Sequence, residues 1–351
     1  MTNQEIPAPA APDTATGAAA ADGTDSGRRQ PTLDLALLGR LAARARSSGI
    51  VVAFVILFVV LAVSSSAFAT ETNLLNILDQ QASTLVIAAA ATLVLVAGNI
   101  DLSMGAVYVL AGVVAAQLAQ SMSSTPAIII GLLVGLGIGA VNGVIVTVLR
   151  INSLIATLAM SFVVAGLGSL VTGGNLITLL NHQGFGDLAA TNILGVQSAV
   201  WITLVFVIAI GLLLTRTVVG HYMYAAGGNP NAARLAGIPV RLVQVLTFTL
   251  LGGAAALGGV IDDSRVLSAQ ASSEFGETLT FTVIAGVVIG GTSILGGAGS
   301  VWRTFFGVLF IALIGNGYAL LGLDPLYQQI TLGGLMLLAV TLDAWATRSV
   351  R

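Results

Sequence analysis

Long apolar runs separated by short polar segments dominate the pattern of this chain. Ten such runs fall at residues 50–69, 82–98, 104–121, 126–149, 153–172, 199–215, 242–261, 279–294, 302–321 and 328–346. Each is close to the ~20 residues that an α-helix needs to cross a bilayer. Continuous apolar runs of this length indicate helices, which satisfy their own backbone polar groups in lipid. The pattern therefore predicts an all-α polytopic membrane protein with about ten transmembrane helices.

The two ends of the chain differ from this apolar body. Residues 1–31 are rich in Ala, Pro, Thr, Gly and Asp and lack apolar periodicity, which is typical of a disordered tail. A weakly amphipathic stretch from Leu33 to Leu41 is expected to lie at the membrane interface. We therefore expect a disordered or interfacial cytoplasmic tail at 1–48, a transmembrane domain at 49–347 and a cytoplasmic carboxyl end at 348–351.

Composition narrows the function classes. Only 8% of the residues are charged, against about 25% in soluble domains. All 13 basic residues are arginine, which excludes a P-loop and a Schiff-base lysine, because both need lysine. There is no cysteine, and His182 and His221 lie far apart. We expect a membrane transport subunit rather than an enzyme, with no metal or cofactor bound by this chain.

The arginines predict the orientation of the spans. With ten alternating spans and the amino terminus inside, only Arg265 falls outside, in accord with the positive-inside rule. Both termini are then cytoplasmic. Two external segments, 173–198 and 262–278, are long enough to dock a partner, although ordinary solvated loops are the alternative. The external segments carry the acids Glu71, Asp79, Asp187, Asp262, Asp263, Glu274, Glu277 and Asp324.

Ten spans divide into two sets of five. An odd number per set makes the two halves inverted, an arrangement that is common in transporters. The sequence trace of such a repeat is short, with Asn142-Gly143 late in the fourth span and Asn316-Gly317 late in the ninth. The predicted architecture is therefore two inverted five-helix halves.

One polar gap between apolar runs carries the signals of a short capped helix. Asn229 is a candidate N-cap, Pro230 falls at the first helical position, and Gly237 suits the left-handed residue that ends a helix. Basic residues accompany it, Arg234 and Arg241 among them. The segment is either an ordinary cytoplasmic loop that is helical or a surface on which a partner acts.

A second polar gap, from Gly98 to Gly105, interrupts the apolar sequence between the second and third runs. Irregular backbone at membrane depth is tolerated only against protein or a water-filled cavity, and a carboxylate there is usually functional. Asp101 is therefore a candidate gating residue, or a helix cap in a short cytoplasmic turn. Other polar positions in or beside the spans either line a pathway or join helices by hydrogen bonds: Asn142, Asn152, Thr157, Ser161, Asn316 and Gln328.

Glycine-rich segments add two expectations. Gly131, Gly135 and Gly139 recur every four residues, a spacing that lets helices approach closely. The run from Gly290 to Ser300 could be mistaken for a phosphate loop, but it lacks lysine and follows an apolar span rather than a strand. We therefore reject nucleotide binding there and expect a tight cytoplasmic turn.

Five segments together carry a family resemblance. They are Gly98-Asn99-Ile100-Asp101-Leu102-Ser103-Met104-Gly105, Asn142-Gly143, Ile151-Asn152-Ser153-Leu154-Ile155-Ala156-Thr157-Leu158, the helix signal from Gly227 to Ile238, and Ile289-Gly290-Gly291-Thr292-Ser293 to Gly296-Gly297. In order and spacing they resemble the membrane permeases of ribose-type ABC importers. The resemblance covers about residues 70–346.

The resemblance implies an ABC importer permease fold in the bacterial plasma (inner) membrane, with alternating access for a sugar or similar polar solute. It implies a homodimer, an ATP-binding cassette ATPase that holds ATP and Mg, and an extracytoplasmic solute-binding protein. The helix at about 229–236 would couple to the ATPase through Gly228, Asn229, Pro230, Ala233, Arg234, Leu235 and Gly237. Translocation or gating would fall to Asn99, Asp101, Ser103, Asn142, Asn152, Thr157 and Asn316.

The chain departs from the family pattern at two motifs. Asn99 replaces the second glycine of the usual Gly-Gly-Ile-Asp, and Thr280-Phe281-Thr282 stands where the family often has Glu-Leu-Asp, with Glu277 displaced upstream. A changed solute or docking surface is therefore expected. Sugars, polyols, nucleosides and branched-chain amino acids all remain alternatives for the identity of the solute. The rival interpretations are an ion-coupled secondary carrier that uses Asp101 and a membrane scaffold or receptor.

Overall fold

The computed structural model describes residues 35–348. Most of the predicted tail and the last three residues lie outside this range. Helix α1 begins at Leu35, so the end of the segment expected as a tail is helical. The chain divides into two units, Met1–Ala42 and Ala43–Arg351. The first contributes only the start of α1 to the described residues, and the second contains all of the elements discussed below.

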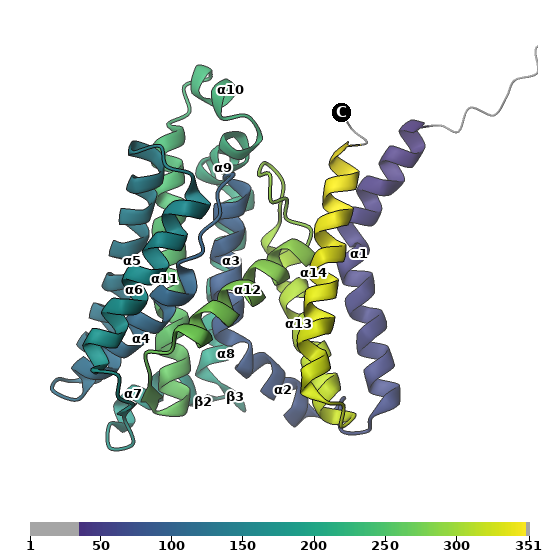
Figure 1. Ribbon diagram of the computed structural model, residues 1–351. Helices are drawn as coiled ribbons and strands as arrows, with labels where there is room; N and C mark the ends of the chain where they lie inside the picture. The colour runs from purple at the N-terminus through teal and green to yellow at the C-terminus, as the bar shows by residue number, and fades with distance from the viewer. Residues whose placement is uncertain (1–34, 349–351) are drawn as a thin grey trace, which may run out of the picture. The chain divides into compact units, whose positions relative to one another are not determined.

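Helices make up most of the described chain, and four two-residue strands lie between them (Figure 1). Up to residue 190 the elements are α1 (Leu35–Ser64), α2 (Glu71–Gln80), α3 (Ala82–Val96), α4 (Met104–Ala119), α5 (Ser124–Val148), α6 (Ser153–Thr172), β1 (Ile177–Thr178) and α7 (Gln183–Ala190). After residue 190 they are β2 (Asn192–Ile193), β3 (Val196–Gln197), α8 (Ser198–Arg216), α9 (Val218–Gly228), α10 (Pro230–Leu235), α11 (Val240–Val266), β4 (Ser268–Ala269), α12 (Ser273–Ile289), α13 (Val301–Leu320) and α14 (Pro325–Arg348).

The helices confirm the all-α membrane class. Five of those described, α5, α6, α8, α11 and α13, are long and apolar enough to cross a membrane singly. Helices α2 and α3 form a further candidate span that is bent by 50° at their junction. Each of the ten expected runs overlaps a described helix.

The helix expected over 279–294 is displaced along the chain. It runs from Ser273 to Ile289, because the Ser272 side chain accepts the backbone N–H of Phe275 and starts the helix early. Gly291, at φ +80°, lies just beyond its end. The expected boundary was wrong because the apolar run continues past the glycines that terminate the helix.

Helix α3 occupies the centre of the second unit. All of its residues from Ala82 to Val96 are buried, and it contacts α8, α11, α12 and α13. A helix that is apolar all round is buried on every side. The irregular segment that follows α3 therefore starts from a helix whose residues are all buried.

Glycines bring α5 and α11 together. A Cβ at Gly135 would overlap the Gly252 carbonyl oxygen and the Ala256 side chain, and one at Gly139 would overlap the Phe248 carbonyl oxygen. These two helices have the most extensive contact in the described chain. The close approach predicted from the four-residue glycine repeat is confirmed.

The two segments expected to be external join into one ordered layer beyond the helices. Strand β1 pairs antiparallel with β4, with Ile177 opposite Ala269. The Ser264 hydroxyl, at the end of α11, accepts the Ala189 N–H and donates to the Phe185 carbonyl oxygen of α7. Figure 1 shows α7 and α10 at opposite ends of the long helices. The layer therefore lies at the end opposite to α10.

The glycine contact between α5 and α11 predicts a contrast between two nearby substitutions. Gly135→Ala should destabilise the protein by about 1–3 kcal/mol, because overpacking forces the helices apart. Gly137→Ala meets open space and should be neutral or stabilising, because alanine favours helix more than glycine. Thermal unfolding of the purified chain in detergent measures both. Equal melting temperatures for the two variants would contradict the packing argument.

Candidate functional site

Helix α10 has the caps that the sequence predicts. The Asn229 side-chain oxygen accepts the N–H groups of Asn231 and Ala232 at 3.1 and 3.0 Å, and Pro230 occupies the first turn. At the other end Gly237 has φ +80°. The Ile238 N–H donates to Ala233 and the Gly237 N–H to Arg234, which is the two-bond pattern of a Schellman motif. The predicted caps are confirmed, and they fix a very short helix at both ends.

The surface of α10 combines a cation with an exposed apolar side chain. Leu235 is 92% exposed, whereas Ala233 is buried. Arg234 donates to the Asn231 side chain at 3.0 Å and remains on the exposed face. Gly228 and Gly237 flank the helix. Apart from Ala233, the residues expected to couple to an ATPase therefore form one small exposed surface, which suits an interface with another protein.

The irregular segment 97–103 between α3 and α4 is held by a buried hydrogen-bond network. The Ser103 N–H and hydroxyl both donate to Asp101 Oδ1, at 2.7 and 2.6 Å. Asn142 Nδ2 of α5 donates to the Ser103 oxygen at 2.7 Å. Asp101 is only 4% exposed, and Ser103 and Asn142 are buried with it. Buried polar groups of this kind are costly unless they are paired, so the network fixes the segment against α5.

Helix α6 supports the same segment through two hydroxyls. Thr157 Oγ1 accepts the Leu102 N–H at 2.9 Å, and Ser153 Oγ accepts the Ile100 N–H at 3.2 Å. Both hydroxyls satisfy backbone donors that have no helical partner. The structure thus brings four of the expected pathway residues, Asp101, Ser103, Asn142 and Thr157, around one broken helix. Ser153 belongs to the same group. It lies in the 151–158 segment that carries the family resemblance, but it is not one of the expected pathway residues.

The other three expected pathway residues make no hydrogen bond to this network. Asn152 is the N-cap of α6, where its side chain accepts the Leu154 N–H at 3.0 Å. Asn99 is buried next to the network and donates weakly to the Ala97 carbonyl oxygen. Asn316 of α13 exchanges two hydrogen bonds with Asn73 of α2, at 2.9 and 3.1 Å. Asn316 therefore joins two helices away from the Asp101 network.

Bare backbone connects α9 to the broken segment, at a contact that we call the glycine junction: Gly98, Gly227, Gly296 and Gly297. A Cβ at Gly227 would overlap the Val96 carbonyl oxygen. The Gly297 N–H donates to that same oxygen at 2.9 Å. Gly98, Gly296 and Gly297 all have positive φ angles, which favour glycine. The junction therefore joins the end of α3, the end of α9 and the 290–300 turn through main-chain atoms.

One side chain supports the junction from the side of α9. Tyr224 donates its hydroxyl proton to the Gly299 carbonyl oxygen at 2.9 Å. Burial raises the pKa of the Tyr224 phenol above its ordinary value, with the Arg303 charge acting in the opposite direction. The hydroxyl therefore stays protonated at physiological pH and remains a donor. Sequence reasoning did not identify Tyr224, because its partner is a carbonyl 75 residues away.

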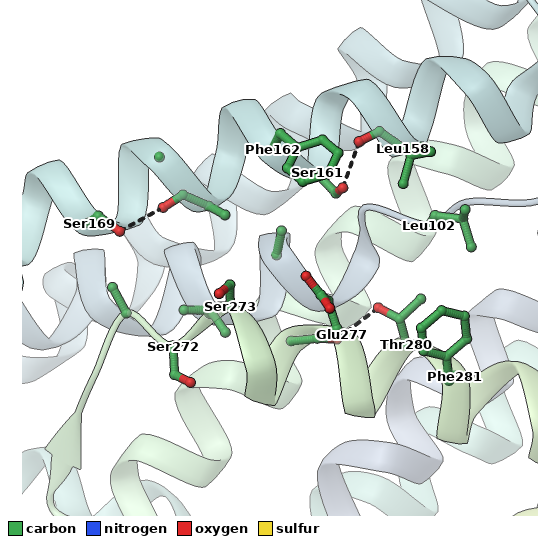
Figure 2. A pocket seen from close by; sticks show the side chains of 16 residues that line it. Leu102, Leu158, Ser161, Phe162, Ser169, Ser272, Ser273, Glu277, Thr280 and Phe281 are labelled. Carbon is green, nitrogen blue, oxygen red and sulfur yellow. Dashed lines mark hydrogen bonds between the residues drawn. The ribbon is translucent and has the colours of Figure 1, made fainter.

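A cavity beside the network is lined by α4, α6 and α12 (Figure 2). Ser161, which the sequence marked as a polar position in a span, lies on its wall together with Ser169 and Glu277. Leu102 of the broken segment also lines it. The Gly105 N–H, at the start of α4, donates to Thr280 Oγ1 of α12 at 3.1 Å. The broken segment that the network holds therefore also forms part of the cavity wall, through Leu102. In the described chain no three His, Asp or Glu side chains converge as metal ligands.

The Asp101 network predicts graded losses of stability. Asp101→Ala should cost about 1–3 kcal/mol, because two buried donors lose their acceptor. Asp101→Asn should cost less, because its amide oxygen still accepts. Asp187→Ala is the control, since that side chain is exposed on α7. Thermal unfolding in detergent provides the comparison, and equal losses for Ala and Asn at position 101 would show that the acceptor is not what holds the segment.

Known proteins are similar to this chain over most of its length. Residues 73–340 match the family described as branched-chain amino acid transport system / permease component. The ribose import permease RbsC of Escherichia coli K12 is 37% identical over 296 residues, 83% of this chain and 92% of the relative. The ribose import permease RbsC of Bacillus subtilis is 38% identical over 291 residues, 82% of this chain and 89% of the relative.

A third relative extends the similarity further. The L-arabinose ABC transporter permease AraH of Azospirillum brasilense is 34% identical over 330 residues, 91% of this chain and 95% of the relative. No solved structure shows significant similarity to this chain. The matched range 73–340 includes the positions of the capped helix, the broken segment and the glycine junction in this chain. The chain therefore belongs to the family of membrane permease components of ABC transport systems.

Proposed function

We propose that this chain is the permease of an ATP-driven importer, and that its solute is a sugar, most specifically a pentose. Relatives that carry ribose and arabinose permease names align with it along nearly their full length. The observation that carries the mechanism is the glycine junction, where the end of α9, just before α10, lies directly against the broken segment at Gly98. A displacement of α10 would therefore be passed through α9 and these main-chain contacts to the segment between α3 and α4.

The proposed topology has ten spans in two inverted halves, with both termini in the cytoplasm. The distribution of arginines supports this orientation. Arg150, Arg234 and Arg241 line one cavity at the α10 end. Arg265 lies in the opposite layer, where it binds the Asp262 carboxylate at 2.7 Å and the Asp79 carbonyl oxygen at 2.9 Å. An excess of arginine at one end marks the cytoplasmic side.

In the proposed mechanism two copies of this chain form the transporter. A solute-binding protein docks on the external layer built from β1, β4 and α7, and a pair of ATPases closes on α10 when ATP and Mg bind to them. Closure displaces α9 and α10, and the glycine junction transmits the movement to the segment 97–103. Asp101, Asn142 and Thr157 hold that segment in one of two arrangements. The permease carries out no chemistry itself.

Exposure of Leu235 predicts how the ATPase recognises α10. Leu235→Asp should reduce recovery of an ATP-binding subunit by about tenfold, because it places an unpaired carboxylate where the leucine would make an apolar contact. Leu194→Asp is the matched control, since Leu194 is 89% exposed in the opposite layer. The measurement is co-purification from native membranes in mild detergent, followed by mass spectrometry.

Two results of that experiment would contradict the proposal. Recovery of the wild-type chain alone under several mild conditions would reject the importer function. Ion-gradient uptake by liposomes that contain only this chain would then favour a secondary carrier. Equal recovery of the ATPase with the two leucine variants would keep the importer but reject α10 as its contact.

A charge reversal at Arg234 separates coupling from folding. Arg234→Glu should leave the spans folded but abolish most of the solute uptake that depends on ATP, because the reversed charge opposes the complementary surface of the ATPase. The measurement compares uptake in vesicles with the thermal stability of the purified variant. Normal uptake by Arg234→Glu would remove α10 from the coupling pathway.

A further inference from the structure

The cavity between α4, α6 and α12 has the size and position of a solute site. Its volume is about 440 Å³, within the range of pockets that enclose small molecules. Figure 2 shows the two long walls, with Ser161 and Ser169 on α6 facing Glu277 and Thr280 on α12. Leu102 closes one side and belongs to the broken segment. A molecule in this cavity would contact the element that the glycine junction moves.

The hydroxyl groups of the wall present acceptors to the cavity. Ser161 donates its proton to the Leu158 carbonyl oxygen at 2.7 Å, and Ser169 donates to Ala165 at 3.2 Å. Thr280 donates to Gly276 at 2.9 Å. A hydroxyl has one proton and two lone pairs. Once the proton is given to the backbone, only lone pairs remain for a ligand.

Glu277 adds a carboxylate to the same wall. Its side chain rises from α12 toward α6 in Figure 2. Within residues 35–348 no hydrogen bond or ion pair to this side chain occurs, and the ion pairs found there involve Arg265. An ionised carboxylate only accepts hydrogen bonds. The polar part of the cavity is therefore matched to a ligand that donates hydrogen bonds and is opposed to an anion.

Aromatic rings supply the remaining contacts. Phe162 of α6 and Phe281 of α12 both line the cavity, and both side chains are exposed. A cyclic polyol has hydroxyl donors at its edge and apolar C–H groups on its face, so it matches both kinds of wall. Ligand sites commonly combine aromatic surfaces with a few polar groups that fix orientation.

We infer that this cavity is the site through which a neutral, hydroxyl-rich solute passes, and that Glu277 is the residue that selects it by accepting solute hydroxyl protons. The inference rests on the proposed importer function and adds the location and chemistry of the site. It also explains how a pathway without the family's Glu-Leu-Asp run retains a carboxylate: Glu277 lies one helical turn before Thr280 on the same cavity wall.

The first test compares two isosteric substitutions on α12. Liposomes that contain the chain, its ATPase and its binding protein are supplied with ribose or arabinose and ATP. Glu277→Gln should lower maximal uptake by about tenfold, because hydrogen bonds to a charged acceptor are worth more than neutral ones. ATP hydrolysis should stay at the wild-type level. Glu274→Gln should behave as wild type, since Glu274 is exposed on the same helix but outside the cavity.

The outcomes separate this inference from the proposed function. If the wild-type chain shows no ATP-driven uptake, the proposed function fails. If wild-type uptake is normal and Glu277→Gln matches Glu274→Gln, the importer stands and Glu277 is not a selectivity residue. Loss of both uptake and ATP hydrolysis in Glu277→Gln would indicate a structural role and would also overturn the inference.

The second test does not depend on transport activity. This chain has no cysteine, so Glu277→Cys or Ser161→Cys introduces a single thiol into each copy of it in the assembled transporter, and labelling is followed on this subunit. Saturating ribose should slow labelling by a small maleimide at both positions and leave labelling of Glu274→Cys unchanged. Ribose-independent labelling at 277 and 161 would reject the site. Protection by choline instead of ribose would show that the cavity takes a cation rather than a neutral polyol.

Discussion

Main-chain contact at the glycine junction is the constraint on which the rest of this structure depends. Gly98, Gly227 and Gly297 meet with no side chains between them. Side chains absorb small displacements by changing rotamer, whereas bare backbone has no such freedom. The fully buried α3 leads into this contact from one side and the capped α10 lies beyond it on the other. A contact between main-chain atoms therefore lies between the exposed α10 and the fully buried α3.

Local sequence rules predict some of these features well and others not at all. The caps of α10 follow from a short window, because Asn229, Pro230 and Gly237 act on neighbouring backbone groups. The break between α3 and α4 is equally local. The partners of that break are not, since Ser153 and Thr157 reach it from α6 and Asn142 from α5. Periodicity carries no information about such tertiary contacts.

Two further features depend on packing that the sequence does not display. Asn316 was grouped with the pathway residues because it is polar and lies in a span, yet its partner is Asn73 of α2. The bend between α2 and α3 was missed because residues 71–81 are polar enough to read as an external loop. In both cases a polar side chain that appeared to face a pathway or solvent is satisfied by another helix. Composition alone does not separate these environments.

Helix α11 runs through the second unit from the α10 end to the layer that contains α7. It has 27 residues, or a length of about 40 Å at 1.5 Å per residue. Its first residues follow α10, and its last residues bind α7 through Ser264. Near its midpoint Gly252 lies against Gly139 of α5. Further close contacts hold it along its length, from Gly143 against Val245 to Gly259 against Gly112. A rod held in this way moves as one body, so a shift at one end is carried to the other. In the proposed importer, a loaded binding protein on one side and nucleotide-bound ATPases on the other would therefore act on the two ends of the same helix.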